Sequence, residues 1–176
     1  LIPVKGIHIL LNGYKKLTDI VSEGHQLIII GPDKSDYIED LKSKYSSINT
    51  ILFTGKKKNI YDYLDKSHCF IQSSMNEGRR EGAPIALQEA MSMKLIAIGS
   101  KVAGINDQLK KFKYLQYNSN NSDELKDIML KTLKTPSNKR KKIGCELRSF
   151  TLKNYSLQSE IQKTEIFLKS LITNHD

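Results

Sequence analysis

Short runs of apolar residues alternate with stretches of helical periodicity through the first two thirds of the chain. The runs cover residues 26–31, 50–55, 68–72, 95–99 and about 113–117. Several are apolar without interruption, which is typical of strands buried on both faces. Strands that alternate with helices at this interval form right-handed βαβ units. The sequence therefore predicts an α/β fold with a Rossmann-like parallel sheet of about five or six strands, covered by helices on both faces.

Apolar side chains recur at helical spacing between these runs and after them. The predicted helices cover residues 6–22, 35–46, 59–66, 84–93, 122–134, 136–150 and 155–173. Asn121, Ser122 and Asp123 are candidate caps for the fifth of them. We divide the chain into a domain over residues 1–150 and a C-terminal amphipathic helix within 151–176. The first strand of such a sheet should precede the helix at residue 6, so we expect the chain to be a piece of a longer protein.

The composition is that of a globular protein with a basic surface. The 176 residues carry 28 Lys and Arg against 19 Asp and Glu, a net charge of +9. This balance indicates an anionic partner, although a Lys-rich composition alone would also produce it. No apolar run approaches the roughly 18–20 residues of a membrane span. Two cysteines, Cys69 and Cys145, form no disulfide or metal pattern, so we expect a cytoplasmic protein.

One short basic segment is a candidate contact with a membrane surface. Residues 139–142 read Lys-Arg-Lys-Lys within a predicted helix. The segment is either a solvated helix face or a contact with anionic lipid headgroups. Peripheral placement on the inner face of the cell membrane stays open on this basis.

The segment over residues 71–91, IQSSMNEGRREGAPIALQEAM, has the composition of a ligand-binding loop. Ligands of open parallel sheets bind beyond the carboxyl ends of the strands, where this loop begins. Pro84 is predicted at the first position of the following helix, whose free amides would attract an anion such as a diphosphate. Glu81 and Glu89, eight positions apart, could accept hydrogen bonds from hydroxyls at two ends of one extended ligand.

The sequence resembles the C-terminal, donor-binding half of glycosyltransferases of family 4 (group 1). These are retaining, nucleotide-sugar-dependent enzymes with the two-domain GT-B fold, and the resemblance extends over about residues 1–115. The motifs that carry it are the Lys5-Gly6 pair, LIIIGP at 27–32, ILFTG at 51–55, FIQSS at 70–74, EGAPIALQEAM at 81–91 and VAGIND at 102–107.

The resemblance implies a role for each matched residue. Glu81 would contact the hydroxyls of the donor sugar and Lys5 the diphosphate, which makes these two the catalytic candidates. Glu89 would bind the ribose. The other expected donor contacts are Gly82, Ala83, Pro84 and Ile85 in the loop, and Gly31, Pro32, Gly55 and Lys56 in two turns that line the same cleft.

The resemblance also implies the chemistry. The donor would be a UDP-, GDP- or ADP-sugar, and no metal or other cofactor is expected, because a Lys, an Arg and a helix dipole stabilise the departing diphosphate. The family is thought to retain the anomeric configuration by attack from the front face of the sugar. We therefore expect neither Glu81 nor Glu89 to act as a nucleophile or a base. The family's phosphate-binding Arg would fall just before Leu1, and the N-terminal acceptor domain is absent. We therefore expect this chain to bind donor but hardly turn it over.

Two hypotheses follow from these observations. In the first, the chain is the nucleotide-sugar-binding half of an enzyme that builds a polysaccharide, lipopolysaccharide or glycolipid, and its partners are the donor, the missing domain and a glycan or lipid-linked acceptor. In the second, it is a non-enzymatic Rossmann-like module that binds a polyanion or a membrane surface. The sequence has no Trp and no aromatics beside a basic stripe, so nucleic acid is not an expected partner.

Overall fold

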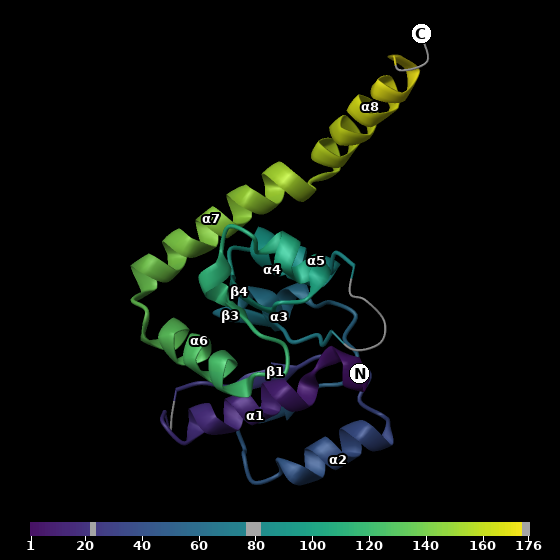
Figure 1. Ribbon diagram of the computed structural model, residues 1–176. Coiled ribbons are helices and arrows are strands. Elements are labelled where there is room, and N and C mark those ends of the chain that lie inside the picture. The colour runs from purple at the N-terminus through teal and green to yellow at the C-terminus, as the bar shows by residue number, and fades with distance from the viewer. Residues whose placement is uncertain (22–23, 77–81, 174–176) are drawn as a thin grey trace.

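The computed structural model describes residues 1–21, 24–76 and 82–173, which form short parallel strands surrounded by helices (Figure 1). The strands are β1 (Leu27–Ile29), β2 (Ile51–Phe53), β3 (Cys69–Gln72), β4 (Ile96–Ser100) and β5 (Gln116–Tyr117). The helices are α1 (Ile7–Thr18), α2 (Asp36–Lys44), α3 (Tyr61–Asp65), α4 (Ile85–Ser92), α5 (Ala103–Gln108), α6 (Ser122–Lys134), α7 (Ser137–Tyr155) and α8 (Leu157–Thr173). Two 3₁₀ turns, η1 (Pro3–Lys5) and η2 (Lys113–Leu115), complete the described elements.

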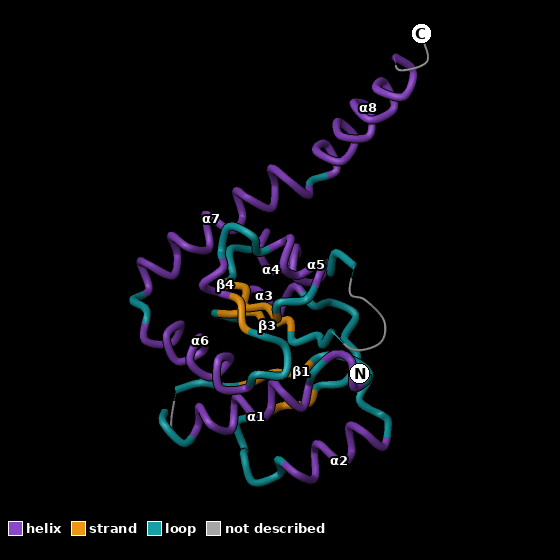
Figure 2. The backbone as a smooth tube through the Cα atoms, viewed as in Figure 1, coloured by secondary structure: helices purple, strands orange, loops and turns teal. Residues whose placement is uncertain are grey.

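The predicted parallel α/β class is confirmed, and each predicted apolar run contains a strand. The described strands form two sheets, however, of order β1-β2 and β3-β4-β5, in which every pair is parallel. Figure 2 shows β1 apart from the neighbouring strands β3 and β4. The two sheets are separated between β1 and β3. Strands β1 and β3 face each other there, but no described strand pairs with either of the facing edges.

A continuous apolar core holds the two sheets together. Strand β4 is buried along its whole length, as expected for a strand with neighbours on both sides. Leu87 of α4 and Leu147 of α7 are fully buried on one side, whereas Leu11 of α1 and Leu125 of α6 are fully buried on the other. Helices α1 and α6 lie side by side in Figure 1 and pack extensively.

The N-terminus of α6 is fixed by side-chain caps. Asn121 is the N-cap, and its side-chain oxygen accepts hydrogen bonds from the backbone N–H groups of Asp123 and Glu124, both 3.1 Å long. The carboxylate of Glu124 in turn accepts the backbone N–H of Asn118 at 2.7 Å. The predicted cap at Asn121 is therefore confirmed, and it ties α6 to the end of β5.

The helical C-terminal region differs in its boundaries from the prediction. The helix predicted over 136–150 continues to Tyr155, and α8 then projects away from the sheets (Figure 1). Several apolar side chains of α8 are exposed, namely Leu157, Ile161, Ile166, Phe167, Leu168 and Leu171. Within the described ranges, no helix combines the length and the apolar character needed to cross a membrane.

Candidate functional site

The first residues of the chain are fastened to the end of β3, which places Lys5 at the carboxyl edge of the sheet. The hydroxyl of Ser73 donates to the backbone carbonyl of Lys5 at 2.7 Å. The backbone N–H of Met75 donates to the carbonyl of Val4 at 2.8 Å. These two bonds hold η1 against the strand end, where ligands of parallel sheets bind.

Gly6 is required for this close approach. Its φ of +64° lies in the left-handed region, and a Cβ atom there would stand 2.0 Å from the carbonyl oxygen of Ser73. A side chain would therefore push η1 away from β3. The Lys5-Gly6 pair thus combines a cation with the residue that lets its backbone lie against the strand end.

The N-terminus of α4 presents free amides toward the same region. Pro84 was predicted at the first helical position, but it is the N-cap, and α4 begins at Ile85. The N–H groups of Leu87 and Gln88 donate to the Pro84 carbonyl, at 3.2 and 3.4 Å. The amides of Ile85 and Ala86 belong to the first turn and have no acceptor within the helix. The positive end of the helix dipole adds to their attraction for an anion.

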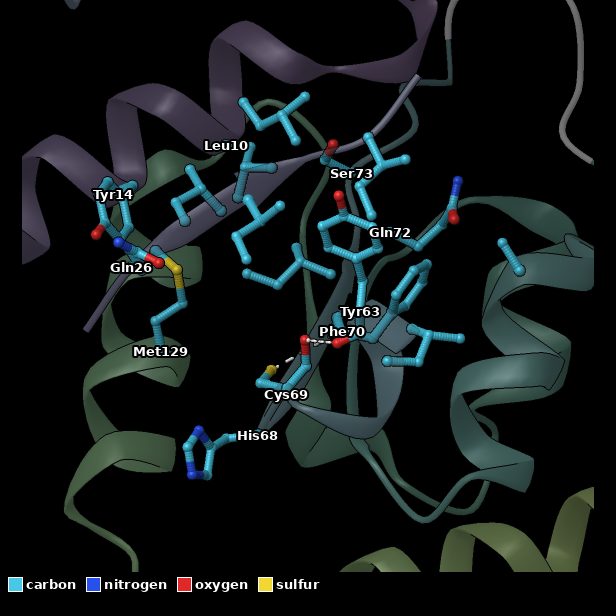
Figure 3. A pocket seen from close by; sticks show the side chains of 18 of the residues that line it. Leu10, Tyr14, Gln26, Tyr63, His68, Cys69, Phe70, Gln72, Ser73 and Met129 are labelled. Atoms are coloured by element: carbon cyan, nitrogen blue, oxygen red, sulfur yellow. Dashed lines mark hydrogen bonds between the residues drawn. The ribbon is translucent and has the colours of Figure 1, made fainter. Parts of the chain in front are cut away.

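A cavity of about 1150 Å³ brings Lys5 and this helix terminus together. Lys5, Pro84 and Ile85 all line it, as does the end of β3 at Ser73 (Figure 3). A lysine and a helix N-terminus that line one cavity form an arrangement suited to a phosphate or diphosphate.

Glu89 has a specific partner that the sequence did not indicate. Its Oε1 atom accepts a hydrogen bond from the phenol of Tyr61 at 3.1 Å. This bond to the carboxylate raises the pKa of Tyr61. Tyr61 opens α3, and the residue is 52% exposed. Glu89 lies on the second turn of α4, so the bond joins α3 to the helix that carries the free amides.

The two glycine turns, at Gly31-Pro32 and Gly55-Lys56, lie next to each other. The N–H of Gly31 donates to the carbonyl of Gly55 at 3.1 Å. Gly55 has a φ of +69°, which favours glycine. Pro32 and Lys56, the residues that follow, are exposed. None of these four residues lines the cavity described above, so the structure places them at the same edge of the fold but not in that cavity.

The loop before α4 depends on a glycine that the sequence reasoning did not single out. Gly82 and Ala83 are exposed, whereas Glu81 lies outside the described residues. A Cβ atom on Gly82 would meet no described atom within 4 Å, so packing does not require a glycine there. On Gly104 of α5, a Cβ would stand 1.2 Å from the carbonyl oxygen of Gly82. The close contact between the two segments therefore requires a glycine at position 104, within the VAGIND motif, and not at position 82.

Comparison with known proteins decides the family. Residues 1–149 match the family described as glycosyl transferases group 1. The chain belongs to this family. As a group 1 glycosyltransferase chain, it is also similar to the uncharacterised glycosyltransferase MJ1059 of Methanocaldococcus jannaschii. The two are 27% identical over 96 residues, which is 54% of this chain and 23% of the relative.

Solved structures define the fold of this group 1 glycosyltransferase chain. It superposes on Alr3699/HepE of Anabaena, solved with UDP and glucose, with a TM-score of 0.82 and 18% identity, over 97% of this chain and 46% of that one. WaaG, a glycosyltransferase involved in lipopolysaccharide biosynthesis, gives a TM-score of 0.72 and 17% identity. This superposition covers 93% of the present chain and 43% of WaaG. The chain spans less than half of each structure and has the fold of one half of a GT-B enzyme.

Proposed function

We propose that this chain binds the nucleotide-diphospho-sugar donor of a retaining, metal-independent glycosyltransferase that transfers a hexose-type sugar. The observation that carries the proposal is the convergence of Lys5 and the N-terminus of α4 on the wall of one cavity, beside Ser73 at the carboxyl end of β3. The complex of Alr3699/HepE with UDP and glucose supports a donor of this kind and makes UDP the first nucleotide to test.

In this proposal each part of the site acts on one part of the donor. The Lys5 ammonium and the Ile85 and Ala86 amides bind the diphosphate and stabilise the charge that develops as the sugar departs. The Glu89 carboxylate accepts hydrogen bonds from the ribose, and Glu81 accepts them from the sugar. The base lies toward the turns at Gly31-Pro32 and Gly55-Lys56.

Binding of the donor tests the proposal directly. We expect UDP-, GDP- or ADP-sugar to raise the thermal unfolding midpoint of the chain, by several degrees at about 100 times its Kd. EDTA should leave the shift unchanged. Glu89→Ala should weaken binding by about 1–3 kcal/mol, because a buried ribose hydroxyl loses its acceptor. Glu165→Ala, on the exposed face of α8, is the matched control and should bind donor as the unaltered chain does.

A different pattern would favour the polyanion-binding alternative. In that case the chain would bind polyanions or anionic vesicles with an affinity that falls steeply with salt. It would also be indifferent to Glu89→Ala and to every nucleotide. Such a result would remove the donor-binding proposal, since that proposal requires one base to be preferred over the others.

The acceptor side of the proposal concerns the longer protein. We propose a polysaccharide, lipopolysaccharide or glycolipid acceptor, held by an N-terminal domain and reached from the cytoplasmic face of the membrane. The role of WaaG in lipopolysaccharide biosynthesis supports this class. The longer protein should transfer the sugar with retention, which NMR of the product's anomeric proton would reveal. Inversion would contradict the proposed mechanism.

A further inference from the structure

A hydroxyl group of β4 fixes the point where the chain leaves β3. Ser100, the last residue of β4, donates a hydrogen bond from its hydroxyl to the backbone carbonyl of Ser74, 2.5 Å away. Both serines are fully buried. The last residues that pair between β3 and β4 are Gln72 and Gly99. The side-chain bond therefore continues the connection between the two strands beyond the end of their ladder.

The backbone of Ser100 is itself held firmly. It pairs with Tyr117 of β5, on the side of β4 away from β3. The carbonyl of Ser100 also accepts a hydrogen bond from the N–H of Val102 at 2.8 Å. Because β4 is buried along its whole length between two neighbouring strands, its backbone moves only when a large part of the sheet opens. Ser100 thus provides a fixed point for the less regular segment after β3.

Ser74 has a second hydrogen bond from the end of its own strand. The Nε2 atom of Gln72 donates to the Ser74 hydroxyl at 3.0 Å. Gln72 and Ser73 stand at the end of β3 on the wall of the cavity that reaches Lys5 (Figure 3). The chain that leaves β3 is therefore held at the Ser74 carbonyl by β4 and at the Ser74 hydroxyl by β3.

The two residues that hold η1 flank Ser74 on either side. Ser73 donates its hydroxyl to the carbonyl of Lys5 at 2.7 Å, and Met75 donates its N–H to the carbonyl of Val4 at 2.8 Å. Each residue has only two soft backbone dihedrals, so a fixed carbonyl at Ser74 restricts the positions of both neighbours. The bond from β4 to Ser74 therefore also determines where the backbone of Lys5 lies.

We propose that Ser100 is a positioning residue for donor binding, which acts through Ser74 to hold Lys5 beside the N-terminus of α4. The inference rests on the proposed function, because it takes Lys5 as the ligand of the diphosphate. Ser100 bonds to the backbone of Ser74 and acts on Lys5 only through it. An alanine at position 100 removes the donor from a buried carbonyl. The chain after β3 is then free to shift, and a displacement of about 1 Å is enough to weaken the contact of a charged group with its ligand.

Hydrogen exchange in the 176-residue chain tests the structural part of this inference without any donor. Ser100→Ala should speed exchange of the Met75 amide at least about tenfold. The Leu27 amide, which donates to Thr50 in the other sheet, is the internal control and should change little. Ile98→Val is the matched variant, because it removes a buried methyl group from β4 and leaves the Ser100 hydroxyl in place. It should not accelerate Met75 more than Leu27. An equal change of Met75 and Leu27 in Ser100→Ala would overturn the inference.

Titration of the same variants with UDP and with uridine, followed by NMR, tests the functional part. Uridine has the base and ribose of UDP but no phosphate for Lys5 to bind. Ser100→Ala should weaken UDP binding about three- to tenfold and uridine binding less than about twofold. Ile98→Val should change neither. If GDP or ADP is preferred, guanosine or adenosine replaces uridine. An equal loss for the nucleotide and the nucleoside would contradict positioning through Lys5.

A double-mutant cycle shows whether the effect passes through Lys5. In a Lys5→Met background, Ser100→Ala should no longer weaken UDP binding. Persistence of the full effect would overturn the inference.

The outcomes separate this inference from the proposed function. An unaltered chain that binds no nucleoside diphosphate contradicts the proposed function, and the donor role of Ser100 with it. If the unaltered chain binds UDP and Ser100→Ala binds it equally well, only the role of Ser100 is overturned.

Discussion

The phenol of Tyr61 donates a hydrogen bond to the carboxylate of Glu89, 3.1 Å away, across the space between α3 and α4. Glu89 is the proposed ribose ligand, so Tyr61 is positioned to hold its carboxylate in one orientation. The bond crosses 28 positions of the chain, which is why no local motif contains it.

Tyr61→Phe tests this positioning role. Loss of the hydrogen bond should leave the fold intact and weaken nucleotide binding about two- to fivefold, the equivalent of roughly 0.5–1 kcal/mol. Isothermal titration with the preferred nucleoside diphosphate measures it. Tyr114→Phe, another exposed phenol, is the control. If Tyr61→Phe binds as tightly as the unaltered chain, Tyr61 has no role in orienting Glu89.

Gly104→Ala should disturb the loop before α4. Its new methyl group would collide with the carbonyl of Gly82, so we expect a loss of about 1–3 kcal/mol in the free energy of unfolding, together with weaker donor binding. Gly82→Ala places a methyl group in open space and should change stability by less than about 0.5 kcal/mol. Urea unfolding of the two variants distinguishes them, and equal losses would show that the contact is relieved without cost.

Lys94→Gly should stabilise the chain. Lys94 lies between α4 and β4 with a φ of +66°, a conformation that costs a residue with a side chain about 1–2 kcal/mol. Glycine is more flexible than lysine in the unfolded state, which offsets part of this cost. We therefore expect the free energy of unfolding to rise by about 0.5–1 kcal/mol. Asn120, with a φ of +68°, tolerates this region better, so Asn120→Gly should gain less. A lower urea midpoint for Lys94→Gly would contradict this account.

Glu124 should contribute stability that acid removes. The hydrogen bond from the Asn118 backbone N–H lowers the pKa of its carboxyl in the folded state. The contribution is therefore complete above the unfolded pKa of about 4.3 and is lost as the pH falls through the lower folded pKa. Glu124→Gln should cost about 1 kcal/mol near pH 6, and this difference from the unaltered chain should shrink toward about pH 3. A difference that is constant with pH would exclude the ionised carboxylate as its source.

The sequence was sufficient to predict the order of strands and main helices, because buried strands and amphipathic helices carry strong periodic patterns. It did not indicate α5, a six-residue helix that includes Gly104 and Asn106 and has no side-chain cap. Nor did it indicate that α7 continues to Tyr155, because Lys153 and Asn154 in its last turn carry no apolar signal. Short or exposed helices are stabilised by their tertiary surroundings, which a local pattern does not contain.

The candidate site was predicted in part. The family motifs identified Lys5 and the N-terminus of α4, and the structure brings these two to one cavity. The role of Gly104 and the bond from Tyr61 to Glu89 were missed, because both depend on contacts between segments distant in the chain. The roles of Glu81 and Glu89 toward the donor stay predictions.

The break between β1 and β3 has a consequence for cooperativity. Within the described chain, the β1–α2–β2 segment shares no strand pairing with the β3-β4-β5 sheet and is joined to it through side-chain packing and the bonds of residues 1–5. Opening this segment should therefore require less free energy than unfolding the whole chain. Calorimetry of the 176 residues should give a van't Hoff enthalpy below the calorimetric one.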